Sequence, residues 1–188
     1  MTTYVPSLTL PSAIFEQPAA SILLPLLIGP TIGYAVRPDR TKTTYRALKQ
    51  PPGNPPPQVF GPVWTALYAT MGYAAYRAYA AGATSIDPRK VALAKQGATL
   101  YTIQLGLNLI WMPLFFGLGR PIEATADIIA LTGVTGYLAY IWVQVDEISA
   151  WCLAPYLGWL GFATYLSAGC GYLNKWNFKG QFQSEKDK

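Results

Sequence analysis

The charged residues of this chain are grouped, and long uncharged, mostly apolar stretches separate the groups. The five longest stretches contain 20, 27, 24, 18 and 27 residues and lie between Glu16 and Arg37, Lys49 and Arg77, Lys95 and Arg120, Asp127 and Asp146, and Glu147 and Lys175. The hydrocarbon core of a bilayer is about 30 Å thick, and a helix needs roughly 20 apolar residues to cross it. The pattern therefore predicts an all-α membrane protein, a bundle of five transmembrane helices in the lipid bilayer.

We expect the helices at about residues 19–36, 59–81, 88–116, 122–145 and 149–172. Pro88 favours the start of the third helix, because the missing N–H of proline costs no hydrogen bond in a first turn. Residues 18–174 then form one transmembrane domain. A polar N-terminal lead at 1–17 precedes it, and a polar tail at 175–188, which we expect to be disordered, follows it.

Residues 37–58 form a basic, proline-rich loop between the first two expected helices, and we call it the lid loop. Proline has no backbone N–H and holds φ near −65°, so the segment from Pro51 to Pro57 cannot lie inside a helix. The loop leads directly into an uncharged segment that carries Trp64 and Tyr68. A stiff cap on a helix with aromatic residues favours a membrane protein with a shaped cavity over a simple anchor.

The composition supports a membrane protein, since only 12% of the residues are charged and 52% are hydrophobic. The alternative, a soluble domain with unusually long buried helices, fits this low and clustered charge poorly. We interpret the net charge of +5 as a sign of topology and not of nucleic-acid binding. Ten basic residues fall on the side of the first loop and four on the other side, which predicts a cytosolic C-terminus.

The chain contains no histidine and only two cysteines, Cys152 and Cys170, which lie at opposite ends of the last expected helix. Imidazole base catalysis and most zinc sites are therefore excluded. The two thiols are too far apart along a helix to form a disulfide with each other. We expect no catalytic residues, no metal site and no enzymatic activity.

Polar side chains within the apolar stretches are the candidates for function. Gln104, Asn108 and Trp111 lie three or four residues apart and share one helix face. Amides are costly in a membrane unless they are paired, so they either join helices or bind a ligand. Asp127 either interacts with the positive end of the fourth helix or belongs to a binding site.

Long ordered motifs give the chain a clear resemblance to the translocator protein family, also known as peripheral-type benzodiazepine receptors and, in bacteria, as tryptophan-rich sensory proteins. The motifs lie within residues 22–174: Tyr45-x-x-Leu48-Lys49 before the prolines, Phe60-Gly61-Pro62-Val63-Trp64-Thr65-x-Leu67-Tyr68, Gln104-Leu105-x-Leu107-Asn108-x-x-Trp111-x-Pro113, Asp127, and Ala154-Pro155-Tyr156-Leu157-x-Trp159-Leu160-x-Phe162-Ala163. The residues of these motifs are similar to those of a fungal member of the family.

The resemblance implies a pocket between the helices, with the lid loop above it, for a tetrapyrrole such as porphyrin or haem, or for a sterol such as cholesterol. It implies a role in transport or sensing and, in a eukaryote, a place in the mitochondrial outer membrane. It also leaves two alternatives: light- and oxygen-dependent porphyrin breakdown at Trp159 and Trp64, or a scaffold role in a membrane complex.

Two stripes of residues match such a pocket. Trp64, Tyr68 and Met71 share a face of the second helix, and Pro155, Trp159, Phe162 and Leu166 share a face of the fifth, bordered by Ala163. Such stripes either pack against each other or form a flat slot, in which an indole N–H or an amide fixes the polar end of a planar ligand.

The chain departs from the family pattern at several places. Gly53 and Asn54 occupy the part of the lid loop where many members carry tryptophan. The small-residue pair that some members use for a homodimer falls on Thr99 and Ile103, which disfavours that contact. One short pattern matches a proposed sterol motif, with an ordinary membrane-interface pair as the alternative; its residues are Leu166, Tyr172 and Lys175.

Overall fold

The computed structural model describes residues 4–36 and 45–178, and all regular secondary structure among them is helical, which confirms the all-α class. The helices are η1 (Pro6–Leu8), α1 (Ser12–Glu16), α2 (Pro18–Ala35), α4 (Pro57–Ala83), α5 (Pro88–Met112), η2 (Pro113–Gly117), α6 (Pro121–Val143) and α7 (Glu147–Leu173). The first part of the lid loop, 37–44, and the end of the tail, 179–188, lie outside the described residues.

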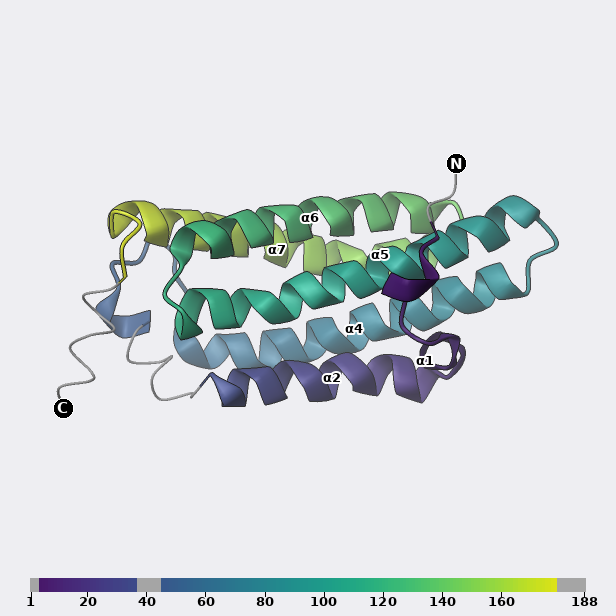
Figure 1. Cartoon of the computed structure of the whole chain (residues 1–188), viewed down its shortest axis with the longest axis horizontal. Coiled ribbons are helices and arrows are strands. Elements are labelled where there is room, and N and C mark those ends of the chain that lie inside the picture. Colours follow the sequence, from purple (N-terminus) through teal and green to yellow (C-terminus); the bar gives the residue numbers. More distant parts are fainter. Residues whose placement is uncertain (1–3, 37–44, 179–188) are drawn as a thin grey trace.

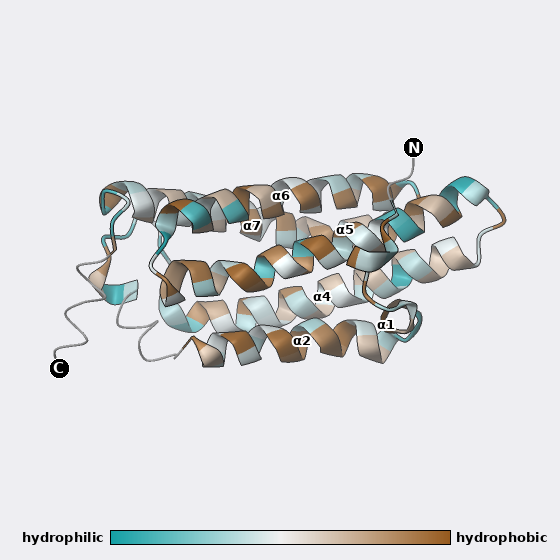
Figure 2. Ribbon diagram, in the orientation of Figure 1, coloured by the Kyte–Doolittle hydropathy of each residue, from teal (hydrophilic) through white to brown (hydrophobic). Residues whose placement is uncertain are grey.

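The five longest helices lie side by side along the long axis of the molecule (Figure 1). α2 packs on α4, α4 packs on α5 and α7, and α6 packs on α5 and α7. Three helical segments, Pro18–Ala35, Pro88–Gly117 and Pro121–Val143, are long and apolar enough to cross a membrane. α4 and α7 have 27 residues each, and Figure 2 shows apolar residues along the helices, with single hydrophilic residues among them, as on α5.

Prolines and aspartates fix where the long helices begin. Pro18, Pro57 and Pro121 each occupy the first turn of a helix, where no intrahelical N–H is needed. Asp87 and Asp146 cap α5 and α7, because their side chains accept hydrogen bonds from the free N–H groups of Arg89 and Ser149. These local signals are readable in the sequence, since each depends on residues only a few positions apart.

A second role of Asp146 is to join α4 to the α6–α7 connection. Arg77 Nε donates a hydrogen bond to Asp146 Oδ2 at 2.7 Å, and Arg77 Nη2 donates to Oδ1 at 3.2 Å. Partial burial acts to raise the pKa of Asp146, but the hydrogen bonds from Arg77 and Ser149 outweigh it and hold the pKa below its usual value. The carboxylate therefore stays charged and paired at neutral pH.

Close backbone contact holds α2 against α4. Ser21 Oγ donates to the carbonyl oxygen of Gly72 at 2.8 Å, and a Cβ built on Gly72 would collide with the backbone of Ser21 and Ile22. Small residues permit such close approach between membrane helices, where packing rather than the hydrophobic effect drives association. Gly72 is therefore a residue that this helix pair needs.

We expect Gly72→Ala to lower the free energy of unfolding by about 1–3 kcal/mol, because the added methyl group forces α2 away from α4. Thermal unfolding in detergent measures the effect. Gly61→Ala is the matched control on the same helix, since a Cβ there meets nothing within 4 Å. Equal unfolding temperatures for the two variants would contradict this account of the α2–α4 contact.

Residues at both ends of the expected domain make contacts with the bundle. The N-terminal lead is not merely a polar extension, because α1 brings Phe15 into the core with 1% of its surface exposed. In the tail, Phe178 is fully buried and lies with its ring centroid 5.3 Å from that of Phe115. Lys175 and Trp176 adopt positive φ angles of 56° and 55°, which reverse the chain after α7.

The third expected helix also ends differently. Regular α-helix stops at Met112, and the five residues of η2 continue it with the wider turn of a π-helix. Pro113 explains the change, because it lacks an N–H and its ring clashes with the carbonyl group four residues before it. Trp111 lies two residues before the first residue of this irregular turn.

Candidate functional site

The buried amides of α5 are hydrogen-bonded to tyrosines of two other helices. Tyr68 OH, on α4, donates to Asn108 Oδ1 at 2.8 Å, and Asn108 Nδ2 donates to Tyr156 OH, on α7, at 2.9 Å. Tyr156 OH in turn donates to Gln104 Oε1 at 3.1 Å. In this structure the two amides therefore join α4, α5 and α7, one of the two roles that the sequence left open.

Tyr156 is the member of this network that the sequence reasoning did not assign. It lies within the Ala154–Ala163 motif and is fully buried. The sequence spacing does indicate its position, because Tyr156 precedes Trp159 by three residues and thus shares a helix face with it. A tyrosine in the middle of an apolar helix needs a partner for its hydroxyl, and here Asn108 and Gln104 supply it.

The two predicted aromatic stripes meet between α4 and α7. The ring centroids of Trp64 and Tyr156 are 6.2 Å apart, and those of Phe60 and Trp159 are 5.8 Å apart. Phe162 extends the group, with its centroid 5.8 Å from that of Trp159. We call these five residues the aromatic cluster; it presents several aromatic faces and edges from two helices in one place.

Two tryptophans and one carboxylate bear buried atoms without a hydrogen-bond partner among the described residues. These atoms are Trp111 Nε1, Trp159 Nε1 and Asp127 Oδ2. A buried polar group without a partner costs about 1–3 kcal/mol, so native proteins keep few of them, often for function. All three residues were candidates from the sequence, and their unpaired atoms are suited to a ligand with polar groups.

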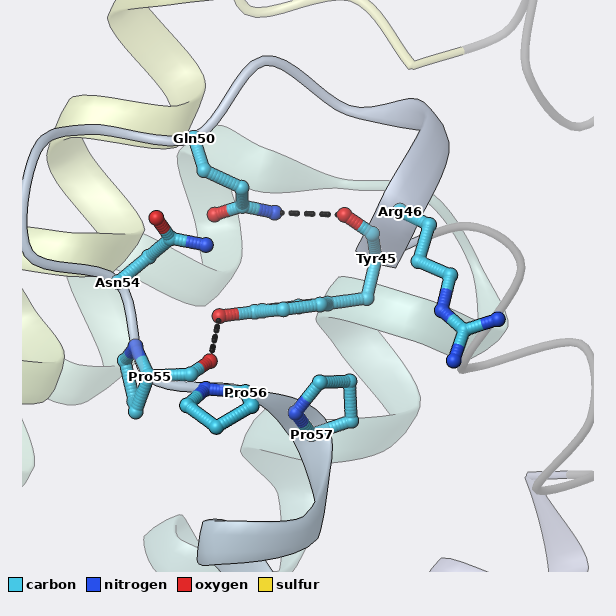
Figure 3. A pocket seen from close by; sticks show the side chains of 7 residues that line it. All are labelled: Tyr45, Arg46, Gln50, Asn54, Pro55, Pro56 and Pro57. Atoms are coloured by element: carbon cyan, nitrogen blue, oxygen red, sulfur yellow. Dashed lines mark hydrogen bonds between the residues drawn. The ribbon is translucent and has the colours of Figure 1, made fainter.

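The lid loop contains a pocket of about 350 Å³, at the small end of the usual range for small-molecule sites. Tyr45, Arg46, Gln50, Asn54 and Pro55–Pro57 line it. Figure 3 shows the amides of Gln50 and Asn54 on one side of the Tyr45 ring, with the prolines below it and Arg46 at the other end. Burial raises the pKa of Tyr45, whose hydroxyl donates to the Pro55 carbonyl oxygen at 2.9 Å.

Tyr45 also connects the lid loop to the aromatic cluster. Its ring centroid lies 5.8 Å from that of Phe60, which in turn contacts Trp159. Both Tyr45 and Phe60 belong to the sequence motifs, but the sequence pattern alone predicts no role for either residue. The contact between them shows that the lid pocket and the aromatic cluster are adjacent layers of one region.

The lid loop is fastened to the C-terminal half of α7. Asn174 accepts a hydrogen bond from the Lys49 amide at 3.2 Å and donates one to the Lys49 carbonyl oxygen at 2.9 Å. Tyr165 OH donates to the Pro52 carbonyl oxygen at 3.1 Å. Gly169 allows Pro51 to approach, since a Cβ there would lie 2.9 Å from the proline ring. Opening the lid loop requires these contacts to break.

The structure does not bring every predicted residue to this region. Pro155 is exposed, whereas Ala163, on the same helix, is partly buried and packs against the core. The three residues of the sterol pattern do not share an environment: Leu166 is buried, Tyr172 is 76% exposed, and Lys175 lies beyond the end of α7.

The chain is similar to known proteins over most of its length. The model of the TspO/MBR family matches residues 21–173. The "Translocator protein homolog" of Schizosaccharomyces pombe is 44% identical over 153 residues, which cover 81% of this chain and 88% of that protein. The human "Translocator protein" is 37% identical over 123 residues, 65% of this chain and 70% of that one. The "Tryptophan-rich protein TspO" of Archaeoglobus fulgidus is 37% identical over 155 residues, 82% of this chain and 95% of its own.

Proposed function

The chain belongs to the TspO/MBR family, and we propose that this membrane protein binds a tetrapyrrole or a sterol in the aromatic cluster beneath the lid loop, for transport or sensing. The observation that carries the proposal is the indole N–H of Trp159, which is buried without a partner among the described residues. Planar apolar ligands stack on aromatic faces, and a buried donor fixes their orientation.

The binding mode that we propose uses each part of the region differently. Rings of the aromatic cluster separate and accept the flat ligand between α4 and α7. Trp159 Nε1 donates to a carboxylate or hydroxyl oxygen of the ligand, and Trp111 Nε1 is the second available donor. The lid loop then closes over the ligand through its contacts with α7. Because its prolines restrict the open state, closure costs less entropy.

The topology that we propose has five membrane crossings, by α2, α4, α5 with η2, α6 and α7. The lengths of α4 and α7, 27 residues each, support a crossing by both. Basic residues concentrated on one side support a cytosolic C-terminus. For a eukaryotic source we propose the mitochondrial outer membrane. A homodimer is a further proposal, which measurement of the oligomeric state in detergent tests.

We propose binding rather than turnover as the activity. The chain has no histidine, and the predicted site residues that carry unpaired buried atoms in the described part of the chain are two tryptophans and one aspartate. Illumination of the protoporphyrin complex in air separates the two activities. Under the binding proposal the porphyrin absorption decays no faster than that of free porphyrin in the same detergent. Faster decay that Trp159→Phe abolishes would instead establish porphyrin breakdown at this residue.

Titration of the purified protein with protoporphyrin IX in detergent tests the proposal. We expect saturable quenching of tryptophan fluorescence, because Trp64 and Trp159 lie in the aromatic cluster. Cholesterol added to the complex distinguishes the ligands: competition indicates a shared site, and unchanged quenching indicates a site for tetrapyrroles only. Quenching that never saturates, or that equals the quenching of free tryptophan, would refute a site in this cluster.

We expect Asn174→Ala to speed protoporphyrin dissociation about fivefold, because it removes both hydrogen bonds that hold Lys49 to α7. Stopped-flow fluorescence measures the rate. Gln144→Ala, which removes a half-buried amide at the end of α6 and not at the lid loop, is the comparison variant. If both variants release the ligand at the rate of the parent protein, the fastening of the lid loop does not control release.

A further inference from the structure

The N-terminal segment lies along α5 and is hydrogen-bonded to its threonines. The Val5 amide donates to Thr99 Oγ1 at 3.3 Å, and the Leu10 amide donates to Thr102 Oγ1 at 3.0 Å. The hydroxyls of Thr9 and Thr99 are 2.7 Å apart. Figure 1 shows this segment and α1 at the opposite end of the bundle from the blue part of the lid loop.

Phe15 carries the segment into the interior. Its ring stacks on Tyr79 of α4 with centroids 5.4 Å apart, and meets the edge of Tyr101 of α5 at 5.8 Å. Only 1% of the Phe15 side chain is exposed. The ring therefore closes the bundle between α4 and α5 at this end.

Behind Phe15 the inner face of α5 is polar. Tyr101, Gln104, Asn108 and Trp111 follow each other at spacings of three or four residues and so lie on one face. The middle two residues are paired in the network with the tyrosines. The outer two, Tyr101 OH and Trp111 Nε1, are buried without partners among the described residues. Tyr101 lies directly against Phe15, and Trp111 lies near the lid loop end.

We propose that residues 5–16 form a plug that closes the end of the bundle opposite the lid loop, and that its release lets water and small polar solutes reach the polar face of α5. The Tyr101 hydroxyl is the first group such a solute meets, and it is free to hydrogen-bond to it. The interior then has two entrances, of which the lid loop controls one and Phe15 the other.

The way in which the plug is held makes it detachable. Apart from Phe15, the residues of α1 are exposed or half-buried, and η1 has no buried residue. Two of the bonds to Thr99 and Thr102 come from backbone N–H groups and the third involves the Thr9 hydroxyl, and water can satisfy all of these groups when the segment leaves. The family match begins at residue 21, so the plug is an addition to the part of the chain that the family model describes.

Thiol accessibility tests the plug. In a protein with Cys152→Ala and Cys170→Ala, the substitution Ala98→Cys places a single thiol one turn from Tyr101 on α5, at a position that is 4% exposed. A charged methanethiosulfonate reagent then reports how often water reaches this position. With Phe15→Ala added, we expect the reaction to be about tenfold faster, because opening no longer removes a large ring from the core.

Two further variants separate release of the plug from general loosening. Thr99→Val with Thr102→Val keeps Phe15 but removes both acceptors, and we expect a reaction about threefold faster. Phe162→Ala removes a ring at the lid loop end and leaves the rate at position 98 unchanged. The proposal is overturned if the threonine variant reacts at the parent rate, or if Phe162→Ala accelerates the reaction as much as Phe15→Ala does.

Discussion

Replacing Trp159 by phenylalanine is expected to weaken protoporphyrin binding about tenfold while leaving the stability of the ligand-free protein unchanged or slightly higher. The substitution keeps an aromatic ring in contact with Phe60 and Phe162 and removes only the indole N–H and part of the ring. In the ligand-free protein that N–H is buried without a partner among the described residues, so its loss removes a cost. In the complex it removes a hydrogen bond.

The combination of these two effects distinguishes a binding residue from a packing residue. Equilibrium titration in detergent gives the dissociation constant, and thermal unfolding of the same samples gives the stability. Trp151→Phe is the matched control, because Trp151 lies on the same helix, is 68% exposed and hydrogen-bonds to Glu147. A Trp159→Phe variant that binds protoporphyrin as tightly as the parent would show that this indole does not hold the ligand.

Replacing Asn108 by leucine is expected to destabilise the fold by about 2–3 kcal/mol. A hydrogen bond between membrane helices contributes only about 0.6 kcal/mol on average, so the lost bonds alone would cost less. The larger cost arises because the Tyr68 hydroxyl, whose partner is Asn108 Oδ1, stays buried and becomes unpaired. Tyr156 is affected less, since it still donates to Gln104.

A second substitution tests this explanation. Tyr68→Phe in the Asn108→Leu background removes the unpaired hydroxyl, so we expect the double variant to recover about half of the lost stability. Gln144→Leu makes the same amide-to-leucine change at a half-buried position at the end of α6 and serves as the control. If the double variant is no more stable than Asn108→Leu alone, the cost lies in the packing of the new side chain at position 108 and not in the hydroxyl.

The lid pocket lies next to the aromatic cluster. The residues that pack these two parts together are therefore also the residues of the proposed binding site. Tyr45 contacts Phe60, and Phe60 contacts Trp159, so we expect that a ligand which separates the cluster would also move the lid loop. We therefore expect the hydrogen bonds of Asn174 to the lid loop to affect the rate at which the ligand dissociates. The indole of Trp159 is expected to affect the affinity for the ligand.

The sequence by itself determined the class of protein and the outline of the candidate site. Uncharged stretches of helical length, prolines at helix starts and the motif around Trp64 identify a helical membrane protein of this family, because each signal depends on composition or on neighbouring residues. The three-and-four spacing likewise placed Gln104 and Asn108 on one face. The periodicity of a sequence identifies the residues that share one face of a helix. It does not identify the neighbouring helix against which that face packs.

Only the tertiary structure decided what those faces contact. Tyr68 and Tyr156 pair with Asn108 across 40 and 48 residues of sequence, and Asn174 holds Lys49 across 125. Phe15 and Phe178 lie in segments that the sequence marks as polar, yet both are buried, since chain reversals bring them back onto the bundle. Such contacts depend on how helices are arranged in space, and no local pattern along one chain encodes that arrangement.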